Sequence, residues 1–209
     1  MKHLVILISG RGSNMKALLT AARAGQWSVQ ITVISNRPAA AGLAIAAEFG
    51  AATRVIDHTG FTSREAFDQA LAEAIEAISP ALVVMAGFMR ILSAQFCERF
   101  AGRLINIHPS LLPAFKGLDT HIRALQAGVS VHGCTVHQVT PELDHGPILG
   151  QAVVPVLQND SPDQLAERVL MMEHQLLPLT VHALLFAQEE PHLCLVHPLL
   201  CQDSPNSSS

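Results

Sequence analysis

Short apolar runs alternate with helix-like segments over the first hundred residues, and this alternation constrains the fold more than any other feature. Residues 81–86 are apolar at every position, as expected for a strand buried on both faces of a parallel sheet. Parallel strands need crossover helices, which pack on the faces of the sheet. We therefore predict an α/β fold: a single-domain, mostly parallel twisted sheet with helices on both faces. The expected strands are 4–8, 29–34, 53–56, 81–86 and 104–107, and the expected helices are 14–24, 41–49, 63–78 and 93–100.

The pattern changes after Pro109. A loop (113–119) and a short helix (121–127) precede two strand-like runs, and a long helix follows. Pro178 is expected to kink or split that helix, because proline removes a helical hydrogen bond. We predict one domain over 1–187 and a partly disordered C-terminal tail over 188–209. The two late strands are expected at 131–139 and 148–156, around a turn-rich segment at 140–147, and the long helix at 162–187.

Composition excludes several classes of protein. Hydrophobic residues make up 49% and charged residues 14%, which is typical of a globular chain. A net charge of -4 argues against a nucleic-acid binder, and no apolar run approaches the roughly 20 residues of a membrane span. The first apolar run is too short for a signal sequence, so we expect a cytoplasmic protein. The 4 cysteines and 11 histidines show no zinc-type spacing, so we expect no metal.

A glycine-rich stretch at residues 9–14, here called the glycine loop, lies between the first predicted strand and helix. Its glycines let backbone N–H groups turn toward an anion at the start of the helix. Met15 stands where a dinucleotide-binding motif has its third glycine, which favours a single phosphate. The alternative is a Gly/Ser turn that merely caps the helix.

Asn106 and His108 lie two residues apart on the fifth predicted strand and therefore project from one face. Pro109 is expected to end that strand, which puts both side chains at its carboxyl end, where open α/β sheets bind ligands. Asp144 in the turn-rich segment could return to this place, and a carboxylate there favours the imidazolium form of the histidine. The alternatives are a structural histidine and a plain turn aspartate. His137, on the strand expected at 131–139, is a candidate support for Asp144.

Four segments together resemble the phosphoribosylglycinamide formyltransferase family, over about residues 5–187. They are 9–14, 86–92, 106–113, and 142–144 with 146–147; residues 63–65 and 173–174 add to the match. The Asn-His-Asp set is shared with methionyl-tRNA formyltransferases and formyltetrahydrofolate hydrolases. The glycine loop and the short length favour the glycinamide ribonucleotide enzymes. Some members carry a histidine at the position of Asp119, whose role stays open.

The resemblance implies a Rossmann-like formyltransferase fold and a role for each matching residue. The catalytic set would be Asn106, His108 and Asp144. The glycinamide ribonucleotide site would be Gly12, Ser13, Asn14 and Glu173. The folate site would be Arg64, Met89, Arg90, Ile91, Leu92, Thr140, Pro141, Glu142 and Leu143. The alternatives are plain core for Met89, Ile91 and Leu92, a surface position for Arg64, and a solvated helix face for Glu173.

The activity that the resemblance implies belongs to purine biosynthesis. The formyl group of 10-formyltetrahydrofolate, a co-substrate, would pass to the amino group of glycinamide ribonucleotide by direct attack of the amine. The expected partners are small-molecule substrates, not nucleic acid or membrane, and a homodimer is left open. Two alternatives remain: a formyltetrahydrofolate hydrolase and a non-catalytic nucleotide-binding module of the same fold.

Overall fold

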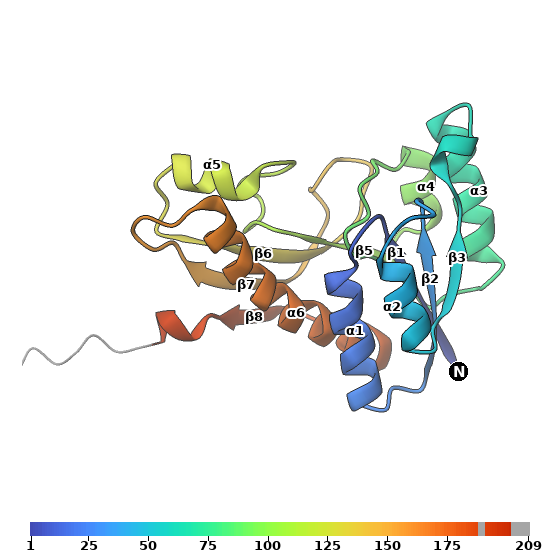
Figure 1. The fold of residues 1–209 in the computed structure, drawn as a ribbon, viewed down its shortest axis with the longest axis horizontal. Coiled ribbons are helices and arrows are strands. Elements are labelled where there is room, and N and C mark those ends of the chain that lie inside the picture. Colours follow the sequence, from blue (N-terminus) through green and yellow to red (C-terminus); the bar gives the residue numbers. More distant parts are fainter. Residues whose placement is uncertain (188–190, 202–209) are drawn as a thin grey trace, which may run out of the picture.

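The computed structural model describes residues 1–187 and 191–201, whose strands form one eight-stranded sheet in the order β3-β2-β1-β4-β5-β6-β7-β8 (Figure 1). The pairs β5–β6 and β6–β7 are antiparallel and all other neighbours are parallel. The predicted mostly parallel sheet is therefore confirmed. The strands are β1 (Lys2–Ile8), β2 (Val29–Ser35), β3 (Ala52–Val55), β4 (Leu82–Met85), β5 (Leu104–His108), β6 (Val131–Gln138), β7 (Ile148–Pro155) and β8 (Leu193–Val196).

Helices cover both faces of the sheet, as predicted. Alternate residues of β1 show why: Leu4 and Ile6 pack into the core that contains Met15 of α1, whereas Val5 packs into the core that contains Phe67 of α3. The first core joins α1 (Ser13–Ala24), α2 (Gly42–Glu48), α5 (Thr120–Gln126) and α6 (Pro162–Phe186). The second joins α3 (Arg64–Glu76) and α4 (Ala94–Arg99), and two short 3-10 turns are η1 (His58–Gly60) and η2 (Pro198–Leu200).

Helix α6 runs unbroken past Pro178, so the prediction of a split helix is wrong. Its start is fixed by a capping box in which Ser161 Oγ accepts from Gln164 N–H (3.2 Å) and Gln164 Oε1 accepts from Ser161 N–H (2.8 Å). The helix is long and apolar enough to cross a membrane by length and composition, but half of that stretch is buried inside the protein. It packs on β6, β7 and α1, and this burial holds the helix together across the proline.

Strand β8 was not expected, because residues after 187 were interpreted as a tail. It pairs in parallel with β7, and Leu193 and Leu195 pack against the core under α6. A strand of four residues has too little periodicity to be recognised without its neighbour. The predicted disorder of the last residues concerns 202–209, which lie outside the described residues.

Candidate active site

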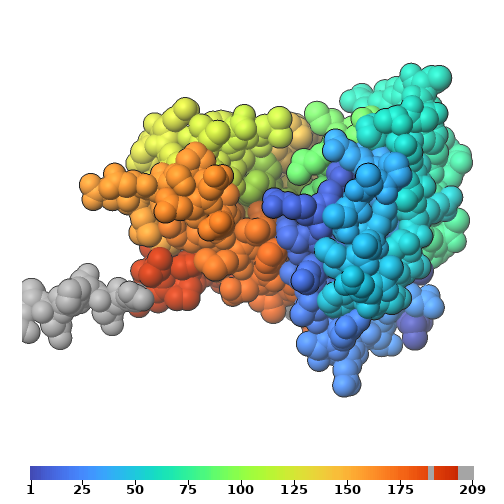
Figure 2. All heavy atoms as spheres, viewed as in Figure 1, coloured from blue at the N-terminus to red at the C-terminus, as the bar shows by residue number. Residues whose placement is uncertain are grey.

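Three loops near the predicted site follow the carboxyl ends of neighbouring parallel strands. The glycine loop follows β1, residues 86–92 follow β4, and residues 109–119 follow β5. In the space-filling view the blue start of α1, the yellow-green α5 region and the orange α6 lie together on one face (Figure 2). The strand order therefore brings segments that are far apart in sequence to one edge of the sheet.

The glycine loop leads into α1 with its backbone donors uncovered. Gly12 has φ 73°, and a Cβ there would lie 3.0 Å from the end of the Met15 side chain and 3.1 Å from the Gly42 backbone. Gly12 is the N-cap residue of α1, and no side chain caps the helix. The N–H groups of the first turn stay available to an anion, and the helix dipole favours one there.

Asn14 instead reaches across to α6. Its Nδ2 donates a hydrogen bond of 2.7 Å to Glu173 Oε2, although the two residues are 159 positions apart. Glu173 is only 7% exposed, so the solvated-face alternative is wrong for it. Burial raises the pKa of Glu173, and the hydrogen bond from Asn14 opposes that shift. A buried carboxylate beside the glycine loop can hold hydroxyl groups of a ligand.

The structure brings His108 and Asp144 together. His108 Nδ1 lies 3.4 Å from Asp144 Oδ2, and both side chains are 7% exposed. His108 Nε2–H donates to the Phe115 carbonyl oxygen at 3.1 Å. Both ring nitrogens thus face acceptors, and only the imidazolium can donate from both. Asp144 has a left-handed backbone (φ 48°) and also accepts from Gly117 N–H at 2.9 Å, so it is more than a turn residue.

His137 lies beside Asn106 and is buried. Its Nδ1–H donates to the Gln138 carbonyl at 2.8 Å, which leaves Nε2 facing Asn106 Nδ2 at 3.4 Å. Burial lowers the pKa of His137, so the ring is neutral near pH 7 and Nε2 can accept from the Asn106 amide. Nε2 is 3.7 Å from Asp144 Oδ1, and two acceptors do not form a hydrogen bond. The structure therefore pairs His137 Nε2 with the Asn106 amide and also puts it 3.7 Å from Asp144, the carboxylate that it is a candidate to support.

A pocket of about 80 Å³ adjoins Asn106 and Asp144. Its walls are formed by the 86–92 loop and by the 140–143 turn, both of which were expected to bind folate. The lining residues are Met85, Arg90, Ile91, Leu92, Cys97, Asn106, His137, Val139, Thr140, Pro141, Glu142, Leu143 and Asp144.

The expected folate residues differ in their surroundings. Met89 and Ile91 are 68% and 63% exposed, so they are not core, whereas Leu92 is 7% exposed and packs in the core under α3. Arg90 holds its guanidinium 5.4 Å from the centre of the Phe67 ring. Arg64 does not line the pocket; its guanidinium is exposed and lies 3.5 Å from a Glu65 carboxylate oxygen. The surface alternative thus describes Arg64 in this structure.

Two more histidines lie near His108 but were given no role by the sequence. His132 is 1% exposed, and its ring contacts those of His121 and Phe115 edge-on at centroid distances of 5.3 and 5.7 Å. Burial lowers the pKa of His132 to about 4, and the neighbouring His121 adds to this shift. The Pro109 carbonyl opposes the shift by a smaller amount. His132 is therefore an uncharged ring under the loop that touches His108. Asp119 begins α5 with φ 56° and makes no side-chain cap.

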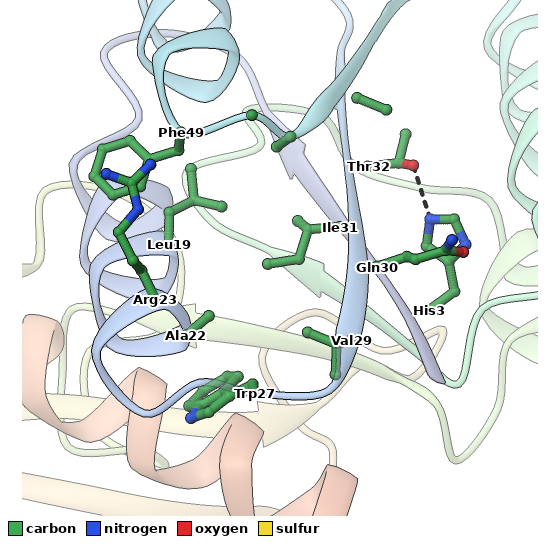
Figure 3. Close-up of a pocket in the computed structure, with 13 residues that line it drawn as sticks. His3, Leu19, Ala22, Arg23, Trp27, Val29, Gln30, Ile31, Thr32 and Phe49 are labelled. Atoms are coloured by element: carbon green, nitrogen blue, oxygen red, sulfur yellow. Dashed lines mark hydrogen bonds between the residues drawn. The ribbon is translucent and has the colours of Figure 1, made fainter. Parts of the chain in front are cut away.

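A larger cavity, of about 600 Å³, lies at the other end of the strands (Figure 3). Its walls come from the end of α1, the start of β2 and the residues before β3, with Trp27 at one side and Arg23 stacked on Phe49 at the other. Among residues 1–187 and 191–201, no predicted site residue and no carboxylate side chain lines it. Size alone favours this cavity, but the convergence of titratable groups favours the smaller pocket as the active site.

Comparisons with known proteins agree with this geometry. The formyl transferase family model matches residues 2–181. The chain is 47% identical over 180 residues to a phosphoribosylglycinamide formyltransferase of Escherichia coli, covering 86% of this chain and 85% of that protein. It is 47% identical over 177 residues to the human trifunctional purine biosynthetic protein adenosine-3, covering 84% of this chain but 18% of that protein.

Solved structures show the same similarity. Glycinamide ribonucleotide transformylase 1 from Symbiobacterium toebii superposes with a TM-score of 0.84 at 41% identity, over 94% of this chain and 95% of that chain. Phosphoribosylglycinamide formyltransferase from Brucella melitensis superposes with a TM-score of 0.82 at 48% identity, over 90% of this chain and 96% of that chain.

Proposed function

The chain belongs to the formyl transferase family, and from this we propose that it transfers the formyl group of 10-formyltetrahydrofolate to the amino group of glycinamide ribonucleotide in de novo purine biosynthesis. One observation carries the proposal: the start of α1, which no side chain caps, and the Asn106, His108 and Asp144 side chains lie at the carboxyl edge of one sheet. A hydrolase needs no nucleotide site, so this edge and the relatives favour the transferase over the hydrolase alternative.

The nucleotide would bind across the glycine loop and α6. Backbone N–H groups of Gly12, Ser13 and Asn14 would hold its phosphate, with the α1 dipole adding to the attraction. The carboxylate of Glu173, fixed by Asn14 at 2.7 Å, would accept hydrogen bonds from ribose hydroxyls. The phosphate and the ribose of the substrate would thus be held independently of any contact with its amine.

The folate would bind between the 86–92 loop and the 140–143 turn. Exposed Met89 and Ile91 offer apolar surface, and loop backbone groups would meet the pterin. Arg90 would line the folate pocket, and the exposed Arg64, outside that pocket, would meet the acidic tail. No cluster of metal-binding side chains occurs among the described residues, and the proposed reaction needs none.

The proposed chemistry is direct acyl transfer. The amine of glycinamide ribonucleotide attacks the formyl carbon, and Asn106, oriented through His137, holds the amine and the formyl oxygen. Because His108 Nδ1 faces Asp144, the donor that would stabilise the oxyanion is Nε2–H. Nε2–H donates to the Phe115 carbonyl in this structure, and the oxyanion would replace that carbonyl as the acceptor. Collapse breaks the bond from carbon to the folate nitrogen, and the amine proton passes to that nitrogen through His108 or water.

The proposed partners are therefore two small molecules. The four cysteines are all free, which agrees with the proposed cytoplasmic location. The homodimer left open by the sequence stays a prediction.

A spectrophotometric transfer assay tests the function. Loss of the formyl group from 10-formyldideazafolate is followed with and without glycinamide ribonucleotide, using wild type and His108→Ala. We expect turnover that requires the nucleotide and falls by about 10²–10⁴-fold in the variant. Turnover without the nucleotide would show a hydrolase, and no turnover in either case would favour a binding module.

A further inference from the structure

Ser9 joins the two substrate loops, although no step of the proposed reaction uses it. Its N–H donates to the Gly87 carbonyl at 3.1 Å, and its Oγ accepts from Met89 N–H at 2.8 Å. Ser9 begins the glycine loop, whereas Gly87 and Met89 belong to the 86–92 loop. Two hydrogen bonds at one residue therefore connect the loop proposed for phosphate with the loop proposed for folate.

Asn36, directly after β2, fixes the direction of the Ser9 hydroxyl. Ser9 Oγ–H donates to Asn36 Oδ1 at 2.6 Å. Because a hydroxyl has one proton, giving it to Asn36 leaves the lone pairs of Oγ for Met89 N–H. Ser9 and Asn36 are 4% and 1% exposed, so solvent cannot readily replace either partner.

Asn36 is itself held by the backbone around it. Its carbonyl accepts from His58 Nδ1–H at 2.8 Å and from His58 N–H at 3.3 Å, and its N–H donates to the Ile8 carbonyl at 3.4 Å. The His58 ring also contacts Phe67 edge-on at a centroid distance of 6.3 Å. Because the Arg90 guanidinium also lies against the Phe67 ring, at 5.4 Å from its centroid, the 86–92 loop is supported at both Met89 and Arg90.

The 86–92 loop needs such support because it has no regular secondary structure. Gly87 takes a left-handed backbone (φ 79°), and residues 88–92 belong to no helix or strand. Its backbone groups would otherwise be free to rotate before a ligand binds, and ordering them would lower the affinity.

We propose that Ser9 and Asn36 are positioning residues for the folate co-substrate, acting through the backbone of Met89. The inference rests on the proposed function, since it names the ligand that the 86–92 loop holds. Loss of the Ser9 hydroxyl would weaken folate binding without weakening nucleotide binding, because the N–H groups of residues 12–14 do not depend on it.

Three variants test this inference. Ser9→Ala removes both hydroxyl contacts, and Asn36→Ala leaves the hydroxyl free to turn away from Met89. Ser35→Ala is the matched control: Ser35 is 0% exposed, and its hydroxyl bonds only the Arg37 backbone, at 2.8 and 3.0 Å. Hydrogen exchange of the Met89 amide is measured by NMR, and calorimetry gives the Kd of 10-formyldideazafolate and of glycinamide ribonucleotide.

In Ser9→Ala we expect the Met89 amide to exchange at least about tenfold faster and the folate analogue to bind about tenfold more weakly, the size of one net hydrogen bond. Asn36→Ala should show smaller changes in the same direction. The nucleotide Kd should stay within about twofold in both, and the control should match wild type in all three measurements.

A protected Met89 amide in Ser9→Ala, or an equal loss of nucleotide affinity, would overturn the inference. A Kd for 10-formyldideazafolate that is no higher in Ser9→Ala than in Ser35→Ala would also overturn it. A wild-type chain that binds no folate analogue would overturn the proposed function as well, so the two failures are distinguishable.

Discussion

Replacing His132 by phenylalanine should remove an acid-sensitive loss of stability. The imidazole is 1% exposed, and burial lowers its pKa from 6.5 to about 4. Above pH 6.5 the ring is neutral in both folded and unfolded chains and costs nothing. As the pH falls below 6.5, His132 becomes protonated in the unfolded chain but stays neutral in the folded chain. The free energy of unfolding therefore decreases until the pH reaches about 4.

The size of this effect follows from the two pKa values. At about 1.4 kcal/mol per unit, the full shift corresponds to about 3 kcal/mol, of which about 2 kcal/mol is lost by pH 5. Phenylalanine keeps an aromatic ring against Phe115 and His121 but cannot be protonated. The free energy of unfolding of His132→Phe, relative to wild type, should therefore rise by about 2 kcal/mol between pH 8 and pH 5.

Urea unfolding at pH 8, 7, 6 and 5 measures this difference. His132→Phe is compared with wild type and with His192→Phe, in which the same substitution is made at an exposed position. Parallel stability curves for His132→Phe and wild type would refute the reasoning, and so would an equal change in the control. Other histidines whose pKa is lowered by burial remain in all three proteins and cancel in the comparison.

Three further predictions concern the site and the fold. Asp144→Asn should lower kcat by about 10²-fold or more with little change in either Kd, because it removes the carboxylate 3.4 Å from His108; steady-state kinetics would contradict this if only KM changed. Burial raises the pKa of Glu173, so its ionisation costs folded-state stability as the pH rises above 4.5. Glu173→Gln should therefore gain Tm relative to wild type from pH 4 to pH 8 while weakening nucleotide binding, and a pH-independent Tm difference in thermal melts would argue against it. Ser161→Ala should cost about 1 kcal/mol in urea unfolding by removing the α6 cap, with Ser28→Ala, at an exposed position outside the helices and strands, as the control.

Much of the fold followed from local patterns in the chain. The apolar residues of 81–86 predicted a strand buried on both faces, and β4 is such a strand. Pro109 predicted the end of the strand that carries Asn106 and His108, and β5 ends at His108. These predictions succeed because periodicity, proline and strand-end position act within a few residues of each other.

Partners across the fold did not follow from such patterns. The sequence favoured a solvated Glu173 unless the family resemblance was used, yet Glu173 is buried against Asn14, 159 residues away. It offered His137 as a candidate support for Asp144, and the ring lies 3.7 Å from that carboxylate, but no pattern indicated that its hydrogen bond to Gln138 leaves Nε2 facing Asn106. The tautomer of a buried histidine is decided by its neighbours, which no local spacing can reveal.

The sequence by itself determined the class of sheet, the strand that carries Asn106 and His108, and the glycine-rich loop that leads into the first helix. Only the tertiary structure decided that α6 continues past Pro178, that residues 193–196 add an eighth strand, and that Ser9 connects the two substrate loops. The physical reason is that elements form from contacts between near residues, whereas their limits and their polar partners depend on burial by segments far along the chain.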